Sequence, residues 1–527
     1  MAKDSTTSAL ASVTTPWVSF VMPSIADLIF IGVVAVLLFT PVANRLLGDA
    51  GTGWHIRTGE QILATRSVPH IDTFSSTMTG KSWFAWEWLF DVVVGELHAT
   101  MGLNGVVWFT ALVIASVFAW TFRLLIARGV DVLTVLVLTM LALYASMIHF
   151  LARPHVVSWL LALAWFWILD STERAELPAN RVWILPLLML IWVNVHGGFL
   201  LGFVLLALFW VGAVWEWFAT KENRIEESLA RIAAAKRTRK LLCVGLVSAA
   251  ASFVNPYGWK LHAHIYSYLS NSFLMDHVDE FKSPNFHGVA QKCFAVLLLI
   301  AVAAVAARGR RLKMSEVLTV LFAVYAGLYA TRNIPVSSIL LVMIVAPLLR
   351  ARNSREVSPD GAFFHRMTRI EARSRGHLWC VAFAVLTLCV CANGGRIGAK
   401  QLMHASFEPS RMPVEAVTFL EQHSMNGPVF APDSWGGYLI YRLYPREKVV
   451  LDDRHDLYGE PFLKSYVTTL HGESGWRQFL DQHEIGCIIL PKDAALTSLL
   501  LETGDWKPIY TDPFAIVFAR DSHQLRP

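Results

Sequence analysis

The sequence contains few charged residues. They make up 16% of the 527 residues, whereas soluble domains have about a quarter. Hydrophobic residues reach 55%, and the mean hydropathy is +0.47. This balance favours a lipid bilayer over water as the surroundings of most of the chain and argues against a wholly soluble protein.

Three further signals are missing. The six cysteines form no CxxC pair and show no metal-ligand spacing, so we expect small buried apolar residues rather than metal ligands. No small-residue cleavage site follows the first apolar run, so a cleavable signal peptide is not predicted. No basic stretch is interleaved with stacking aromatics, which argues against nucleic-acid binding.

Apolar runs of membrane-spanning length recur along the chain. About 20 apolar residues cross a bilayer as a helix, and shorter runs suffice when they are packed or tilted. Eleven ranges predict spans: 26–44, 104–126, 131–150, 155–170, 182–195, 198–218, 241–255, 290–307, 315–331, 334–350 and 377–393. The stretch 84–101 is predicted to be an amphipathic helix at the membrane interface, a location that tryptophan also favours.

The distribution of lysine and arginine predicts the orientation. Alternate connections carry the basic residues: Arg123 with Arg128, Arg174 with Arg181, and the stretches 221–240, 308–313 and 350–375. Basic loops stay in the cytoplasm, so the tail 1–25 is predicted to be cytoplasmic. With an odd number of spans, residues 394–527 are then extracytoplasmic. The stretch 221–240 also has a second interpretation, an amphipathic helix that binds lipid or a partner.

The last part of the chain has the pattern of a small α/β domain. Apolar runs at 428–432, 448–452 and 487–491 predict buried strands, and 435–444, 475–483 and 494–503 predict helices between them. Residues 506–520 predict a closing hairpin. The expected fold is therefore mainly α, a polytopic transmembrane helical bundle over 26–393 with an extracytoplasmic α/β domain over 394–527.

The predicted first outer loop, 45–103, is unusually long and polar. Its reactive and aromatic side chains are Asp49, His55, Arg57, Glu60, His70, Asp72 and Glu87, with Trp54, Trp83, Trp86 and Trp88. Long ordered loops are usually functional. A carboxylate beside a histidine can act as a general base or hold a cation. The tryptophans either stack on sugar or lipid or form an interfacial belt.

Four more polar clusters lie at span ends on the same predicted face. They are Arg153 with His155, Asn194 with His196, Asn255 with Tyr257, and Arg332 with Asn333. Ionisable residues at such positions indicate function. The asparagines and histidines have a competing interpretation as helix caps. The two arginines depart from the positive-inside trend and suit an anionic group such as a phosphate, so we expect one cavity roofed by the tail.

The motifs resemble those of a known superfamily. The first outer loop contains D-x(4)-W-H-x-R-x-G-E, P-H-x-D-x-F-S and W-x(3)-E-W-L, and later segments contain N-x-H-G-G, N-P-Y-G, R-N-x-P, DSWGGYLIYRL and VVLDDRHDLYG. This set looks like that of bacterial membrane proteins of the GT-C glycosyltransferase superfamily. The most similar branch is that of protein mannosyltransferases and the lipid A aminoarabinose transferase. The resemblance covers roughly 40–350 and 410–520.

The resemblance implies a bacterial inner-membrane transferase. Such an enzyme takes sugar from a polyprenyl-phosphate-linked donor and acts at the extracytoplasmic face on a glycan, lipid or protein acceptor. Asp49 matches the superfamily's acidic residue that activates the acceptor or binds a metal, so a divalent cation is the implied cofactor and Asp49 its candidate ligand. Many members have an acidic pair here. This sequence has none, and Glu60, Asp72 or Glu87 are the candidates for a second carboxylate.

These patterns together predict the site. Asp49 and His55 are the expected catalytic residues, because either can deprotonate an acceptor hydroxyl. The expected substrate- and phosphate-binding residues are Arg57, Glu60, Glu87, Arg153, His155, Asn194, His196, Asn255, Tyr257, Arg332 and Asn333. The acidic segment 451–459 either faces the cavity or forms salt-bridged loop ends.

Two other functions stay open. One is a non-catalytic assembly or scaffold protein of the cell envelope, in which the tail domain does the binding. The other is a lipid or solute transporter, which is less favoured because the sequence shows little charge near mid-bilayer and few paired broken helices.

Overall fold

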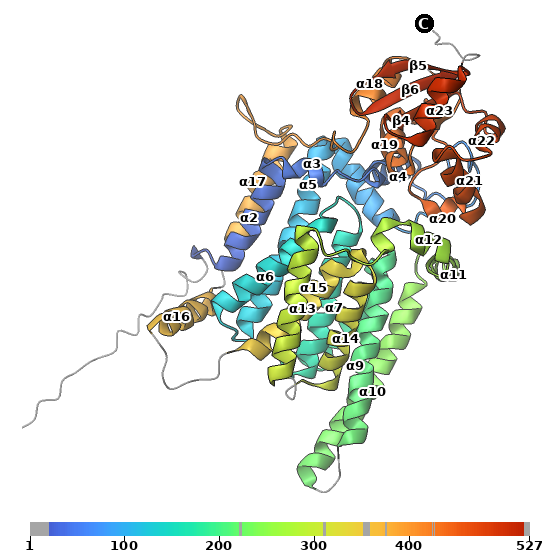
Figure 1. The fold of residues 1–527 in the computed structure, drawn as a ribbon. Helices are drawn as coiled ribbons and strands as arrows, with labels where there is room; N and C mark the ends of the chain where they lie inside the picture. Colours follow the sequence, from blue (N-terminus) through green and yellow to red (C-terminus); the bar gives the residue numbers. More distant parts are fainter. Residues whose placement is uncertain are drawn as a thin grey trace, which may run out of the picture.

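Helices dominate the structure and stand side by side as a bundle, with a smaller mixed region at one end (Figure 1). The computed structural model describes residues 21–220, 224–308, 312–350, 359–374, 377–423, 425 and 427–520. Most of the predicted tail 1–25 lies outside these residues.

Each predicted span contains a helix. These helices are α2 (Ile25–Phe39), α5 (Trp88–Ala127), α6 (Val132–Ser146), α7 (His155–Glu173), α8 (Leu185–Trp192), α9 (Leu200–Ala219), α10 (Ile225–Ser252), α13 (Val289–Arg308), α14 (Met314–Tyr329), α15 (Ile334–Leu349) and α17 (Leu378–Ala392). Shorter helices connect them or flank the bundle, namely α3 (Val42–Arg45), α4 (Gly51–Thr65), α11 (Trp259–Leu269), α12 (Ser272–His277) and α16 (Pro359–Arg373).

Among the described residues, six helices are long and apolar enough to cross a membrane by themselves. They cover Trp88–Ala127, Val132–His149, His155–Glu173, Gly197–Ala219, Val289–Arg308 and Thr331–Leu349. One bent pair, Arg366–Arg373 with Leu378–Ala392, would make a seventh. The protein is therefore a multi-pass membrane protein, and the count of eleven spans stays a prediction.

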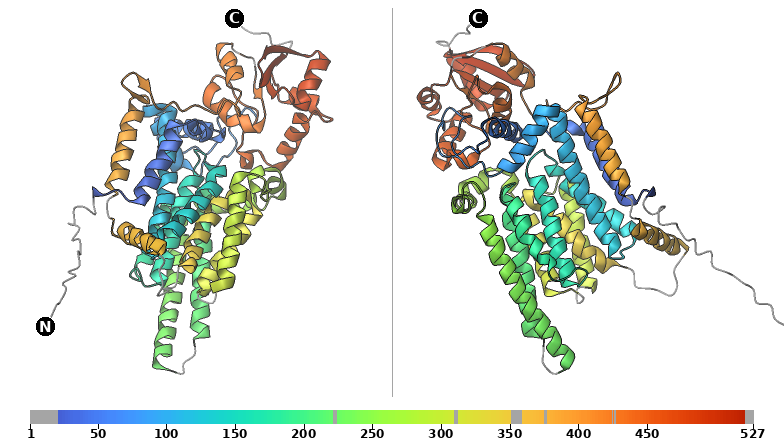
Figure 2. Two further views of the ribbon diagram at one scale, coloured as in Figure 1. Left: turned by 60° about the vertical axis from the view of Figure 1, so that its left-hand side comes forward. Right: turned by 180° about the vertical axis from the view of Figure 1, so that it is seen from behind.

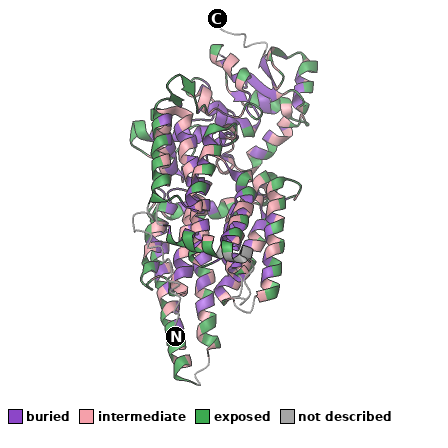
Figure 3. Ribbon diagram, turned by 90° about the vertical axis from the view of Figure 1, so that its left-hand side faces the viewer, coloured by how far each residue is buried: buried purple, intermediate pink, exposed green. Residues whose placement is uncertain are grey.

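The outer sides of the bundle are apolar. Leu246, Leu299 and Leu321 are 65%, 69% and 60% exposed. Figure 3 shows exposed residues along the outward sides of the helices and buried residues between them. Large exposed apolar surfaces of this kind mark contact with lipid.

One predicted boundary is wrong. Helix α10 begins at Ile225 and runs for 28 residues, so most of the basic stretch 221–240 is helical instead of a loop. Its alanines, lysines and arginines are good helix formers. Helices α9 and α10, the green pair in Figure 2, extend furthest from the C-terminal region.

Helix α5 has a break where the sequence predicts a boundary. This helix has 40 residues and joins the predicted interfacial helix 84–101 to the span 104–126. The two parts meet at a kink at Gly102, whose φ is 61° and ψ is −157°. Glycine adopts this conformation without steric penalty, so the chain bends there.

The C-terminal region is α/β, as the sequence predicts. Its strands are β3 (Val429–Phe430), β4 (Cys487–Pro491), β5 (Trp506–Thr511) and β6 (Ala515–Arg520), in the order β3-β4-β6-β5. Only β3 and β4 are parallel. The helices are α18 (Val414–Gln422), α19 (Asp433–Leu443), α20 (His455–Tyr458), α21 (Glu460–Leu470), α22 (Trp476–Gln482) and α23 (Ala495–Thr503). A small ribbon of β1 (Arg396–Ile397) and β2 (Lys400–Gln401) precedes them.

The predicted strand 448–452 does not form a full strand. Val449 makes only isolated bridges, one to Val429 and one to Ser75 in the predicted first outer loop. This segment therefore joins the C-terminal region to that loop, because one of its two bridges is to Ser75, which lies outside the sheet.

Helix α4 is held tightly between the bundle and the C-terminal region. A Cβ on Gly59 would lie 1.8 Å from the backbone oxygen of Asp91 on α5. A Cβ on Gly53 would lie 2.3 Å from the backbone oxygen of Gly437 on α19. Only glycine allows backbones this close. These contacts fix the C-terminal region against α4, which carries several of the predicted site residues.

Candidate functional site

Arg153 lies between two carboxylates that come from opposite ends of the chain. Its Nη1 is 3.1 Å from Asp49 Oδ2 and 3.5 Å from Asp453 Oδ2. The backbone N–H of Gly51 donates to Asp49 Oδ1 (2.8 Å), and the indole N–H of Trp54 donates to Asp453 Oδ1 (2.9 Å). The second carboxylate near Asp49 is thus supplied by the C-terminal region.

The ionisation of Asp453 reflects this crowding. Burial raises its pKa to about 7, and the negative charge of Asp49 raises it while Arg153 opposes the shift. A Cβ on Gly51 would lie 2.4 Å from Asp453 Oδ2 and 2.9 Å from Asp49 Oδ1. Glycine at position 51 therefore makes room for the two carboxylates to meet.

A second group surrounds Glu87. Its Oε2 is 3.7 Å from Nε2 of His55, and its Oε1 is 3.7 Å from Nε2 of His196. Burial raises the pKa of Glu87 to about 7, partly offset by the positive charge of Arg153. Both distances exceed the length of a hydrogen bond, so the carboxyl group interacts with the two imidazoles through electrostatics alone.

The two imidazoles have lowered pKa values. Burial, followed by the charge of Arg153, holds the pKa of His55 well below its ordinary value, and burial does the same for His196. The backbone N–H of Gly198 donates to His196 Nδ1 (3.1 Å), so the ring hydrogen lies on Nε2 and faces Glu87. His55 Nδ1 is 2.6 Å from Asp91 Oδ1, and His55 Nε2 has no hydrogen-bond partner among the described residues.

The shifted pKa of Glu87 predicts a pH-dependent stability. A carboxyl group whose folded pKa is raised from 4.5 to about 7 contributes stability that is present at acidic pH and lost as pH rises through about 7. Between about pH 6 and 8.5, we expect the apparent Tm of the wild type to fall by on the order of 2–4 °C more than that of Glu87→Gln. Thermal unfolding of both proteins in nanodiscs measures this. Parallel pH profiles would contradict it. His55 and His196 are present in both proteins, so their opposite pH trend cancels.

Arg332 lies on the other side of this polar group. Its Nη1 is 3.3 Å from Glu280 Oε1, and its guanidinium lies 4.5 Å from the centre of the Phe281 ring. The pKa of Glu280 falls to about 2: burial raises it, but the charge of Arg332 and then that of Arg153 lower it more. Both arginines act on one carboxylate, so they lie within electrostatic reach of the same space. His155, whose Nε2 is 2.8 Å from the His149 carbonyl, lies there too.

Arg57 and Glu60 have a different position. Arg57 donates to the Tyr441 carbonyl and to Glu60, and Glu60 is 2.7 Å from His98 Nδ1. His98 Nε2 is 2.9 Å from the Tyr441 hydroxyl. These contacts connect α4, α5 and α19, so the structure gives this pair a role in holding the C-terminal region in place. Their predicted role in binding substrate stays a prediction.

The polar side chains in the tight turns mostly contact backbone. Asn194 donates to the carbonyls of Leu190 and Val254, and its Oδ1 accepts from the Trp88 indole. Asn333 donates to the carbonyl of Ala326. These are helix-end contacts of the kind that asparagine commonly makes.

The N-P-Y-G turn is also internally bonded. Asn255 donates to the carbonyls of Ser252 and Gly258, and its Oδ1 accepts from the backbone N–H of Tyr257. The Tyr257 hydroxyl donates to the Pro69 carbonyl and accepts from the Ala85 N–H, both at 2.7 Å. This tyrosine therefore fastens the predicted first outer loop.

The acidic segment 451–459 forms ion pairs in two directions, which agrees with its interpretation as salt-bridged loop ends, and its facing a cavity stays a prediction. Asp453 faces Arg153, as described above. Arg454, by contrast, is 3% exposed and forms a buried ion cluster with Asp72 (2.8 Å) and Asp452 (2.7 Å). Of the residues near the site, sequence reasoning missed Glu280 and Asp91. Asp91 was missed because it lies within an apolar helix, where the sequence shows no polar cluster.

The residues present do not form an evident metal site. Among the described residues, no group of three or more histidine, cysteine, aspartate or glutamate side chains could hold a metal ion. One guanidinium, that of Arg153, already occupies the position between Asp49 and Asp453. A divalent cation on this pair would have to displace Arg153, so we derive no chemical step through a metal.

Comparison with known proteins shows the class of fold. No protein-family model and no curated protein matches the chain. The apo Archaeoglobus fulgidus oligosaccharyltransferase aligns with a TM-score of 0.52 at 12% identity, over 89% of this chain and 69% of that one. The Archaeoglobus fulgidus oligosaccharyltransferase AglB, in complex with an inhibitory peptide and a dolichol-phosphate, gives 0.53 at 11%, over 88% and 69%.

A further structure, ArnT from Cupriavidus metallidurans bound to undecaprenyl phosphate, aligns over 94% of this chain and 96% of that one with a TM-score of 0.49 at 12% identity. The chain thus shares the fold of these oligosaccharyltransferase structures, in line with the fold that its motifs predict.

Proposed function

We propose that the protein is a membrane glycosyltransferase that moves a sugar from a polyprenyl-phosphate-linked donor to an envelope acceptor at the extracytoplasmic face of the bacterial inner membrane. The observation that carries the proposal is the pairing of Asp49 and Asp453 around Arg153, with Arg332 within electrostatic reach. This arrangement supports the proposal, because it would place a carboxylate base beside two cations that suit a phosphate.

The chemistry is a displacement at the anomeric carbon. A carboxylate of the Asp49–Asp453 pair takes the proton of an acceptor hydroxyl, and the oxygen forms a bond to the sugar. The bond between the sugar and the lipid phosphate breaks, and the polyprenyl phosphate leaves with the electron pair. Asp49 stays the expected base, and Asp453 is added because its pKa of about 7 suits proton transfer near neutral pH.

The two arginines would bind the phosphate. Among the described residues, the ion pairs of the Arg153 side chain involve Nη1, which leaves its other N–H groups for a ligand. Arg332 is partly exposed and held by Glu280 and the Phe281 ring. A guanidinium fork matches phosphate oxygens and stabilises the charge that grows on the leaving group.

The Arg332 side chain offers a direct test of this function. We expect Arg332→Met to weaken the binding of undecaprenyl phosphate to the purified protein in nanodiscs by roughly 10-fold or more, because a charge-assisted hydrogen bond contributes about 1.5–3 kcal/mol. The matched control is Lys464→Met, which removes an exposed cation on α21 and should bind like the wild type. Equal binding by Arg332→Met and the wild type would show that the lipid phosphate does not bind at Arg332.

Transfer itself is tested separately. The wild type is incubated with undecaprenyl-phosphate-linked hexoses and pentoses and a lipid extract of the envelope, and release of the lipid phosphate is measured. Release that depends on an acceptor supports the enzyme. Lipid binding without any transfer would favour the alternative, a non-catalytic assembly protein.

A further inference from the structure

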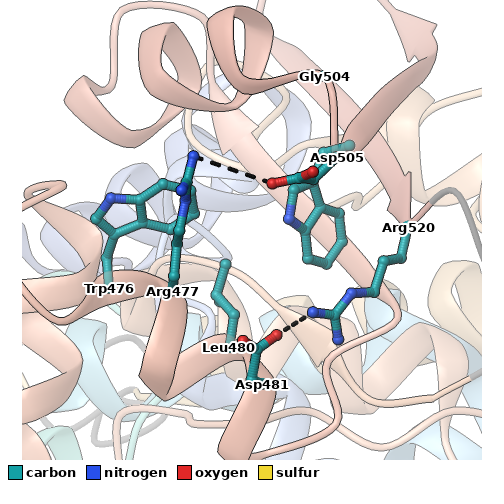
Figure 4. Close-up of a pocket in the computed structure, with 8 residues that line it drawn as sticks. Trp476, Arg477, Leu480, Asp481, Gly504, Asp505 and Arg520 are labelled. Carbon is teal, nitrogen blue, oxygen red and sulfur yellow. Dashed lines mark hydrogen bonds and ion pairs between the residues drawn. The ribbon is translucent and has the colours of Figure 1, made fainter.

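The C-terminal region has a polar pocket that the proposed transfer does not use. It has a volume of about 310 Å³ and is lined by two residues each of tryptophan, arginine and aspartate: Trp476, Trp506, Arg477, Arg520, Asp481 and Asp505. Figure 4 shows Trp476 and Arg477 on one side, Asp505 and Arg520 on the other, and Asp481 below. The pocket is built from α22, the start of β5 and the end of β6, without any residue of α4 or the spans.

Each arginine at the pocket makes two kinds of contact. Arg520 pairs with Asp481, and its guanidinium lies 5.7 Å from the centre of the Trp506 ring. Arg477 lies 5.1 Å from the Trp476 ring, and its Nη2 is 4.0 Å from Asp505. Each guanidinium thus has one aromatic and one acidic neighbour, which holds its hydrogen-bond donors at the pocket wall.

The charges of the pocket balance. Two guanidinium groups face two carboxylates, so neither an anion nor a cation gains a net electrostatic advantage. A strongly apolar ligand is also disfavoured, because it would leave these charged groups without hydrogen-bond partners. The ligand that fits is neutral, rich in hydroxyl groups, and apolar on one face.

We propose that this pocket binds a neutral saccharide. A pyranose ring presents C–H groups that pack on an indole, and its hydroxyl groups both donate and accept. The aspartates accept from those hydroxyls and the arginines donate to them. The volume of about 310 Å³ lies at the lower end of the range of small-ligand sites, about 300–1,000 Å³, which suits one or two sugar rings.

Such a site would hold a glycan chain away from the Asp49–Arg153 cluster. That consequence rests on the proposed function, because it assigns the glycan as an acceptor or product. The binding does not rest on it, since saccharide binding can be measured without any transfer.

The experiment uses the full chain in phosphatidylcholine nanodiscs, free of glycoside detergents that would compete for the pocket. Saturation-transfer NMR and calorimetry are recorded with neutral gluco- and manno-trisaccharides and, separately, with inorganic phosphate. We expect saturable binding of at least one saccharide, weakened about 3- to 10-fold or more in Trp476→Ala, since aromatic contacts contribute about 0.5–1.5 kcal/mol. Asp505→Asn, an exposed change with little risk to folding, should weaken it as well.

Two controls make the result decisive. Trp259→Ala removes an exposed tryptophan outside the pocket and should bind like the wild type. Asp49→Asn should also bind the saccharide normally, so failure of the proposed transfer and failure of this site give different results. The proposal is overturned if no saccharide binds, if both pocket variants bind like the wild type, or if phosphate binds and saccharides do not.

Discussion

Asp49→Asn is expected to reduce sugar transfer by roughly 10²- to 10⁴-fold, the usual contribution of a positioned general base. Asparagine keeps the shape of the side chain and can still accept from the Gly51 N–H. Asparagine cannot take a proton from the acceptor. Of the two carboxylates that contact Arg153 in the wild type, only Asp453 remains. The loss should therefore appear in the rate of transfer, with little change in folding.

The measurement is release of labelled sugar from undecaprenyl-phosphate-linked donor by wild type and variant at matched protein levels. Asp279→Asn is the control, because its side chain is 95% exposed and pairs only with Lys282 among the described residues. Asp453→Asn separates the two carboxylates. If Asp49→Asn retains wild-type rates while Asp453→Asn does not, the base is Asp453; if both retain them, the proposed chemistry is wrong.

Arg454→Met is expected to destabilise the protein by about 3–5 kcal/mol, as breaking a buried ion cluster does. The change leaves Asp72 and Asp452 without their cation, and both side chains are fully buried. Methionine also loses the contact of the guanidinium with the Trp83 ring, 4.5 Å away. The cluster joins the predicted first outer loop to the C-terminal region, so the two should separate on heating before the bundle unfolds.

A thiol-reactive dye can follow this unfolding through the buried cysteine Cys487 of the C-terminal region. We expect the apparent Tm to fall by roughly 5–15 °C, given a few degrees per kcal/mol in large domains. Lys464→Met, a surface change on α21, should leave it unchanged. An Arg454→Met protein that melts like the wild type would show that the cluster contributes no net stability.

Local patterns explain what could be predicted from the sequence. The spans and the β5–β6 hairpin depend on runs of neighbouring residues, so each of them can be predicted from its own segment of sequence. The break at Gly102 lies where the sequence predicts it, between 84–101 and 104–126. The continuous helix α10 was missed, because its charge pattern suggested a boundary where helix propensity allows continuation. Turn residues such as Asn255 were ambiguous for a related reason: capping and ligand binding use the same side-chain atoms.

Long-range pairing explains what could not be predicted. Nothing in the sequence around Asp49 indicates that its neighbouring carboxylate is Asp453. Arg57 and Glu60 have the residue types of a ligand site, yet their contacts with Tyr441 and His98 hold two parts of the chain together. Only the packing of α19 on α4 through Gly53 and Gly437 distinguishes these roles.

The same packing has a consequence for biosynthesis. Asp49 and Asp72 leave the ribosome about 400 residues before Asp453 and Arg454, an interval of roughly 20–80 s at ordinary translation rates of about 5–20 residues per second. During that time the first outer loop has been made without the residues that complete its ion pairs and cover α4. A chain that stops before α19 can still pair Asp49 with Arg153, but Asp72 lacks Arg454 and α4 lacks its cover, so we expect quality-control proteases to recognise such a chain.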